Sequence, residues 1–215
     1  MATMSSTTQI DPLDDLSETE DQITSSKYCL SEEDYVALIE GAVRERRFEV
    51  ISNGKARHAV FIITKMFSIA DRTVEIYSGK LAATVSHNDD VVAVYGAEDL
   101  LKAVCHFLKQ EGTSLSILVE NAHEFNPDDH PIVQKVNHLK KANKLHGKVS
   151  IRAAAQEQRP PNHFMVVDRV AYREENDHSN ARALANFCDP IKSSRLSKSF
   201  QDAFSKGREV YCVCA

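Results

Sequence analysis

The stretch PPNHFMVVDRVAYREE, residues 160–175, decides which fold we expect for this chain. A proline pair interrupts regular structure, and two short apolar runs follow, joined tightly after Asp168. This pattern predicts a β-hairpin. Because side chains alternate across a strand, His163 and Met165 would share one face of the sheet, and Phe164 and Asp168 the other.

The segments on either side of the hairpin alternate between helical and extended patterns. Apolar residues recur at helical spacing in five segments, of which the second also allows a strand: 31–47, 54–71, 97–112, 131–147 and 190–207. Apolar runs predict strands at 72–79, 113–121, 148–154 and 208–214. Within the ambiguous residues 81–96 we expect a short helix, a polar loop at 87–90 and a strand at 91–95. This order predicts an α/β fold of three layers, α-β-α, with a mixed, mainly parallel sheet.

The composition is that of a folded domain with a polar extension. The chain has 215 residues, of which 42% are hydrophobic, and this is enough for the core of one domain. Residues 1–27 are rich in Ser, Thr, Asp and Glu, so we predict a disordered acidic tail there and a single domain over 28–215. The net charge of −5 argues against binding polyanions through bulk charge, although it is compatible with a local basic patch.

Two features indicate the compartment. No apolar run approaches the roughly 18 residues that would span a bilayer, and the polar, acidic N-terminus lacks the features of a signal peptide. The five cysteines are odd in number and follow no regular spacing, which is typical of reduced thiols. These features predict a cytoplasmic protein without a membrane partner.

His163 stands out among the nine histidines because it opens a strand, at an edge of a sheet where clefts form. One interpretation is a histidine that only hydrogen-bonds a neighbouring loop, and the other is a chemical role. No phosphate-binding glycine loop, HExxH, GxSxG or paired-cysteine signature occurs, so we expect neither a metal ion nor a cofactor.

Residues 50–205 resemble the phospholipase D superfamily. That family carries an HxK pattern on a strand, followed about four residues later by Asp, then a hairpin, small residues with Asn, and a helix. His163, Asp168 and Asn186, the last in ALANFCDP, match the histidine, aspartate and asparagine of this pattern. The resemblance implies a phospholipase D-like fold in which the histidine attacks a phosphodiester, and it makes these three residues the candidate catalytic residues.

Two departures from the family pattern bear on catalysis. Met165 occupies the lysine position of HxK, and a thioether cannot make the ammonium's contact with a phosphate. Losing one such contact typically costs about 3 kcal/mol of transition-state stabilisation. Arg152, Arg169 and Arg173 are candidates to bind the phosphate instead. The family's site uses two motifs and this chain has one, so we expect a homodimer with two copies of His163 face to face.

Two further clusters carry ligand-type side chains. SHNDD, residues 86–90, holds a histidine and two carboxylates, but adjacent residues do not easily converge on one ion, and a solvated turn is favoured. HLKKANKLHGK, residues 138–148, is a basic stretch that would serve phosphate contact if it lay near His163. As the polar face of a helix it needs no function.

These features lead to three hypotheses. The first is a catalytically degenerate phospholipase D-like domain acting as a regulatory or binding subunit for a nucleotide, a nucleic acid or a protein partner, with the acidic tail as the segment that contacts the partner. The second is an active, metal-independent phosphodiesterase or nuclease, working as a homodimer with His163 as nucleophile. The third is an α/β scaffold protein with no small-molecule site.

Overall fold

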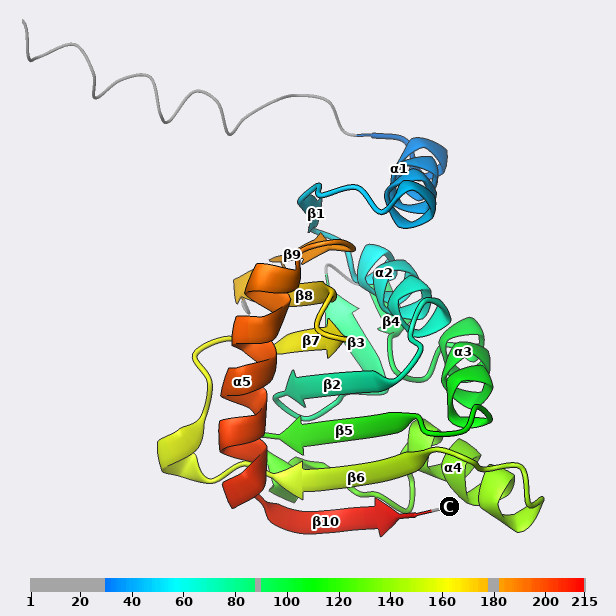
Figure 1. Cartoon of the computed structure of the whole chain (residues 1–215), viewed down its shortest axis with the longest axis vertical. Helices are drawn as coiled ribbons and strands as arrows, with labels where there is room; N and C mark the ends of the chain where they lie inside the picture. The colour runs from blue at the N-terminus through cyan, green and yellow to red at the C-terminus, as the bar shows by residue number, and fades with distance from the viewer. Residues whose placement is uncertain (1–29, 88–89, 178–181, 215) are drawn as a thin grey trace, which may run out of the picture. The chain divides into compact units, whose positions relative to one another are not determined.

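An eight-stranded sheet forms the centre of the computed structural model, which describes residues 30–87, 90–177 and 182–214 (Figure 1). Its strands, in chain order, are β1 (Ile51–Asn53), β2 (Thr73–Ser78), β5 (Ser114–Val119), β6 (Lys148–Ala153), β7 (Phe164–Val167), β8 (Ala171–Asp177), β9 (Arg182–Asn186) and β10 (Arg208–Val213). A separate two-stranded sheet pairs β3 (Thr84–His87) with β4 (Asp90–Ala93). The chain divides into two units, Met1–Tyr35 and Val36–Ala215, and both sheets belong to the second.

The strand order in the large sheet is β1-β9-β8-β7-β2-β5-β6-β10. The pairings of β2 with β5 and of β5 with β6 are parallel, and the other five pairings among the described strands are antiparallel. The predicted mixed sheet is therefore confirmed, but the prediction that it is mainly parallel is wrong. The strands β7, β8 and β9 are consecutive in the chain and pair in antiparallel order, as hairpin connections require. The other three antiparallel pairings, β1 with β9, β2 with β7 and β6 with β10, join strands that are distant in sequence.

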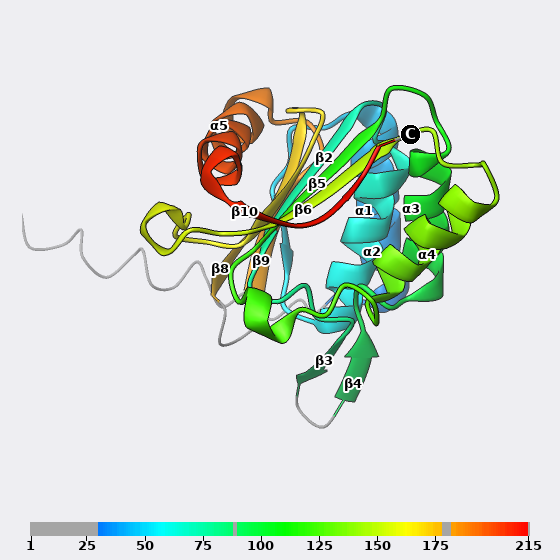
Figure 2. The ribbon, with the colours of Figure 1, turned by 90° about the horizontal axis from the view of Figure 1, so that it is seen from below.

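Four described helices cover the two faces of this sheet (Figures 1 and 2). α2 (Ala56–Ser68), α3 (Glu98–Leu108) and α4 (Pro131–Lys141) lie on one face, and α5 (Pro190–Lys206) crosses the other. The predicted three-layer α/β fold is therefore confirmed. α1 (Glu32–Glu45) spans the boundary between the two units, and short 3-10 turns occupy Ala122–Glu124 and Gln156–Gln158.

α4 and α5 begin where the sequence provides caps. α4 and α5 each have proline at the first position, where the missing backbone N–H would have no helical partner. The Asp189 side chain accepts the Lys192 backbone N–H at 2.9 Å and so caps α5. Ring nitrogen Nδ1 of His130 accepts the Ile132 backbone N–H and does the same for α4.

The predicted alternation of β7 is visible in its packing. Phe164 and Val166 belong to the buried cluster between the sheet and α5, with Tyr77, Leu118, Tyr172, Phe200 and Ala203. His163 points to the opposite face and shares a cavity with residues of α2. Met165 is buried, with 2% of its surface exposed.

Three of the described strands, β1, β3 and β9, were not predicted from the sequence. Residues 84–87 form β3 where we expected a short helix, because β3 finds a pairing partner in β4. β9 has Leu184 as its one large apolar residue, and β1 has only 3 residues, so neither gave a recognisable pattern. The predicted tail, residues 1–27, lies outside the described residues.

Candidate functional site

His163 lies where β7 begins, beside the end of β2, because Phe164 pairs with Tyr77 in the antiparallel register. β2, β5 and β6 are parallel, so their carboxyl ends meet at this edge of the sheet. Gly79, which follows β2, permits the close approach of the imidazole. A Cβ atom at Gly79 would lie 3.1 Å from Cε1 of His163.

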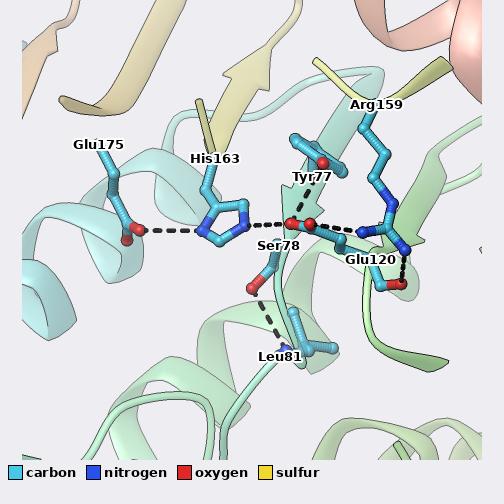
Figure 3. Close-up of polar contacts among 7 residues, drawn as sticks. All are labelled: Tyr77, Ser78, Leu81, Glu120, Arg159, His163 and Glu175. Atoms are coloured by element: carbon cyan, nitrogen blue, oxygen red, sulfur yellow. Dashed lines mark hydrogen bonds and ion pairs between the residues drawn. The ribbon is translucent and has the colours of Figure 1, made fainter. Parts of the chain in front are cut away.

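Two carboxylates flank the imidazole (Figure 3). Nε2 of His163 lies 3.0 Å from Oε2 of Glu120, the residue that follows β5. Nδ1 lies 3.3 Å from Oε2 of Glu175 on β8. A carboxylate only accepts hydrogen bonds, so two ionised carboxylates at these positions match an imidazolium, whose two ring nitrogens both donate.

Further side chains hold each carboxylate in place. Arg159 donates to Oε1 of Glu120 at 2.8 Å, and the Tyr77 hydroxyl donates to Oε2 at 3.3 Å (Figure 3). Arg173 donates to Oε1 of Glu175 at 2.8 Å. We call His163, Glu120, Glu175, Arg159 and Arg173 the ion-pair cluster. Its three cations and two carboxylates leave one net positive charge.

The ionisation of these groups is mutually dependent. Burial disfavours the charged form of His163, but hydrogen bonds to Glu175 and Glu120 outweigh it and raise the pKa of His163 above its ordinary value. Burial also favours neutral Glu175, yet His163 and Arg173 hold the pKa of that carboxyl at about 2. The pKa of Glu120 is lowered because His163 and Arg159 outweigh its burial.

The cluster borders a cavity of about 340 Å³, within the range typical of small-molecule sites. Its apolar wall comes mainly from α2 and from the residues around β4: Ala56, Ala59, Ile63, Val94 and Tyr95. Its polar wall includes Ser78, Lys80, Asn121, Glu124, His163, Arg173 and Glu175. The His163 side chain is 21% exposed, so the imidazole is not sealed in the core.

The geometry decides what His163 can do chemically. A histidine that attacks a phosphodiester needs a ring nitrogen with a free lone pair directed at the substrate. Both ring nitrogens of His163 instead face carboxylate oxygens. The arrangement suits an ion pair that joins β7 to β5 and β8 and that fixes one wall of a cavity.

The other predicted catalytic residues lie elsewhere. Asp168 sits in the turn after β7, four strand residues from His163, which corresponds to a separation of about 16 Å. Its carboxylate accepts the backbone N–H groups of Asp71, Arg72 and Thr73. Asn186 is fully buried at the end of β9, where its Oδ1 accepts the Cys188 N–H. In this structure Asp168 and Asn186 therefore do not lie beside His163.

The three predicted ligand-binding arginines are also separated. Arg173 borders the cavity, but it is buried and holds Glu175. Arg169 donates to the Ser197 hydroxyl of α5 from the turn after β7. Arg152 donates to the backbone carbonyl of Phe204 and lies over that residue's ring. Only Arg173 thus lies beside His163.

Sequence reasoning missed Glu120, Glu175, Arg159 and Tyr77. Glu120 could have been found, because it is a charged residue directly after a continuous apolar strand, at the edge where a parallel sheet places its sites. Glu175 is the second residue of a charged pair at the end of the hairpin, and alternation places it on the face of His163. Arg159 lies in a loop, and nothing in its sequence context predicts the contact.

In the described part of the chain, no helix is long and apolar enough to span a membrane. Among the same residues, no three side chains of His, Cys, Asp or Glu are grouped so as to hold a metal ion. Part of the SHNDD stretch lies outside the described residues.

The sequence matches one protein-family model. That model, Domain of unknown function (DUF7931), matches residues 55–212. No curated protein sequence matches the chain.

Several solved structures are similar to this one. Nuc from Salmonella typhimurium, described as a phospholipase D family member, is 16% identical over 75% of this chain and 97% of its own, with a TM-score of 0.46. TrmBL2, an archaeal chromatin protein, is 16% identical over 83% of this chain and 60% of its own, with a TM-score of 0.49. NucT from Helicobacter pylori is 12% identical over 75% of this chain and 100% of its own, with a TM-score of 0.44. These values are too low to transfer an activity or a ligand.

Proposed function

We propose that this chain, which belongs to the family described as Domain of unknown function (DUF7931), is a non-catalytic, phospholipase D-like binding domain. We further propose that the cavity beside His163 binds a nucleotide. The first hypothesis from the sequence allowed a nucleotide, a nucleic acid or a protein as the partner, and this proposal selects the nucleotide.

One observation carries the proposal: carboxylates engage both ring nitrogens of His163. An imidazolium held in this way is a poor nucleophile, because protonation removes the lone pair that would attack phosphorus. Met165 contributes no ammonium group, and Arg152 and Arg169 bind elsewhere, so they do not replace it. These contacts support binding without turnover.

The two walls of the cavity support the class of ligand. The apolar wall suits the flat, weakly polar surface of a nucleobase, and Tyr95 lies within it. On the polar wall, Lys80, His163 and Arg173 face Glu124 and Glu175, which leaves one net positive charge for a phosphate group. Lys80 is 56% exposed and paired with Glu124 at 3.2 Å, so its ammonium group is accessible from solvent.

All of the groups that hold His163 come from one chain, so the ion-pair cluster forms without a second copy. The predicted homodimer and the protein partner of the acidic tail both stay predictions. The cytoplasmic location does so as well.

Calorimetric titration with nucleoside monophosphates and with the matching nucleosides tests the ligand. We expect the monophosphates to bind and the nucleosides to bind more weakly. Ala59→Met, which fills the cavity from α2, should abolish binding, while the exposed Glu157→Ala should not change it. Equal binding by Ala59→Met and the unaltered chain would refute the cavity as the site.

Incubation with single- and double-stranded nucleic acid in EDTA tests the absence of turnover. We expect no cleavage by the unaltered chain. Cleavage that His163→Ala removes and that His123→Ala, an exposed histidine, retains would instead establish the phosphodiesterase hypothesis.

A further inference from the structure

A second charged region lies away from the cavity, where α3 and α4 run side by side (Figures 1 and 2). A groove of about 490 Å³ is lined there by Glu98, Leu101, Lys102, Cys105, His106, Lys109 and Lys135. It shares no lining residue with the cavity at His163. Lys109, which directly follows α3, and Lys135, on α4, both line this groove.

Further lysines continue this groove beyond the end of α4. The backbone N–H groups of His146 and Gly147 donate to the carbonyl of Leu108, so the segment after α4 lies against the end of α3. Lys109 and Lys148 are therefore neighbours at the amino ends of β5 and β6, the opposite edge of the sheet from His163. We define the basic face as these exposed side chains: Lys109, Lys135, Lys140, Lys141, Lys144 and Lys148.

The basic face is concentrated in a chain that is acidic as a whole. Residues 130–156 contain no Asp or Glu, whereas the formal net charge of the chain is −5. Within the described residues, none of the six lysines forms an ion pair, although Glu111 follows Lys109 by two residues, and the acidic side chains of α3 itself lie in its first turn. Glu98 and Asp99 there already pair with Lys102. These six exposed lysines make the region around α4 and the end of α3 locally positive, which suits an anion with many charges.

The uncharged residues of the region narrow the class of anion. The large apolar side chains that are exposed in the described parts of the chain are Leu30, Phe48, Val50, Val91, Val170 and Ile191, and none belongs to α3, to α4 or to the basic face. A membrane-binding face would present apolar groups to the lipid, and a protein partner would need apolar anchors. Single-stranded nucleic acid would stack on aromatic rings, and Phe107 on α3 is fully buried.

We propose that the basic face binds the phosphate backbone of double-stranded nucleic acid without regard to base sequence, at a site separate from the nucleotide cavity. Lysine ammonium groups attract phosphates as point charges, and a duplex keeps its bases stacked, so it needs no aromatic platform. The inference does not depend on the cavity.

Fluorescence anisotropy with a short labelled DNA duplex of arbitrary sequence tests this inference on the full chain. We expect binding at low salt. The logarithm of the binding constant should fall linearly with the logarithm of the salt concentration. Lys109→Glu combined with Lys135→Glu should weaken binding at least tenfold and reduce the salt slope by about 2, because each lost phosphate contact reduces it by about 0.9. The matched control is Lys198→Glu combined with Lys206→Glu on α5, which should change affinity less than about twofold.

Three results separate this inference from the proposed function or overturn it. The Lys109→Glu, Lys135→Glu variant should still bind nucleotide, and Ala59→Met should still bind the duplex. Equal losses in the two double variants would overturn the basic face as the site. Absence of duplex binding at low salt, or binding to phosphatidylserine vesicles in its place, would overturn the assignment of the ligand. Unchanged circular dichroism melting curves establish that each variant is folded.

Discussion

The two ends of β7 hold their polar residues in different ways. At one end, the Asp168 carboxylate accepts three backbone N–H groups, from Asp71, Arg72 and Thr73, at 2.7, 2.9 and 2.6 Å. At the other end, His163 contacts side chains that themselves titrate and that border a cavity. Backbone donors cannot titrate or move without unfolding the segment. The Asp168 end therefore anchors the fold, whereas the His163 end can respond to pH and to a ligand.

The largest expected effect comes from the anchor. Asp168→Ala leaves three backbone N–H groups without their acceptor, and we expect it to lower the free energy of unfolding by about 3 kcal/mol. Chemical denaturation measures this, with the exposed Glu157→Ala as a control that should stay within about 0.5 kcal/mol of the unaltered chain. Nucleotide affinity of the folded Asp168→Ala variant should be unchanged. If Asp168→Ala were as stable as the unaltered chain but did not bind nucleotide, Asp168 would serve binding and not stability, contrary to our assignment.

The ion-pair cluster should make stability depend on pH in two windows. Glu175 has a folded pKa of about 2 against an ordinary 4.5, so its contribution is complete above 4.5 and is lost as pH falls toward 2. His163 has a raised pKa, so its contribution is complete below its ordinary 6.5 and is lost as pH rises through the folded pKa.

Denaturation of the unaltered chain and of His163→Gln across pH checks both windows. The neutral amide cannot titrate, so the loss of stability on the alkaline side should disappear in this variant. The acidic loss should shrink as well, because Glu175 has lost its contact with the imidazolium. An alkaline loss that persists in His163→Gln would mean that another group produces it.

The smallest effect concerns the packing of the imidazole. Gly79→Ala would place a methyl group 3.1 Å from Cε1 of His163, so the ring must shift by a few tenths of an ångström. We expect a destabilisation of about 1 kcal/mol and weaker nucleotide binding. Gly54→Ala is the matched control, because a Cβ atom there has nothing within 4 Å. If both variants behaved alike in calorimetric titration, the close contact at Gly79 would have no functional consequence.

The parts of the fold that could be predicted from the sequence are those with periodic apolar patterns. The hairpin at 163–175, the helices that became α2 to α5 and the strands β2, β5, β6 and β10 all carry periodic apolar patterns, and these patterns depend on burial alone. β9 and β1 carry no such pattern, because Leu184 is the one large apolar residue of β9 and β1 is too short. Because these two antiparallel strands give no sequence signal, the sequence predicts a sheet that is more parallel than the one observed.

The site was harder to predict than the fold. His163 was identified from its position at a strand start, but the residues that determine its state come from β5, β8 and the loop before β7. Their convergence depends on strand order, and a single sequence does not encode strand order in any local pattern. Asp168 follows β7 as closely as His163 precedes it, and only the structure shows that the two residues lie at opposite edges of the sheet.

Long-range proton–nitrogen correlation NMR of the His163 ring near neutral pH reports the protonation of each ring nitrogen, with His163→Gln used to assign the signal. We expect both ring nitrogens to be protonated, as an imidazolium between Glu120 and Glu175 requires. A neutral ring with one unprotonated nitrogen would contradict this expectation, since that nitrogen would be available to attack a phosphodiester.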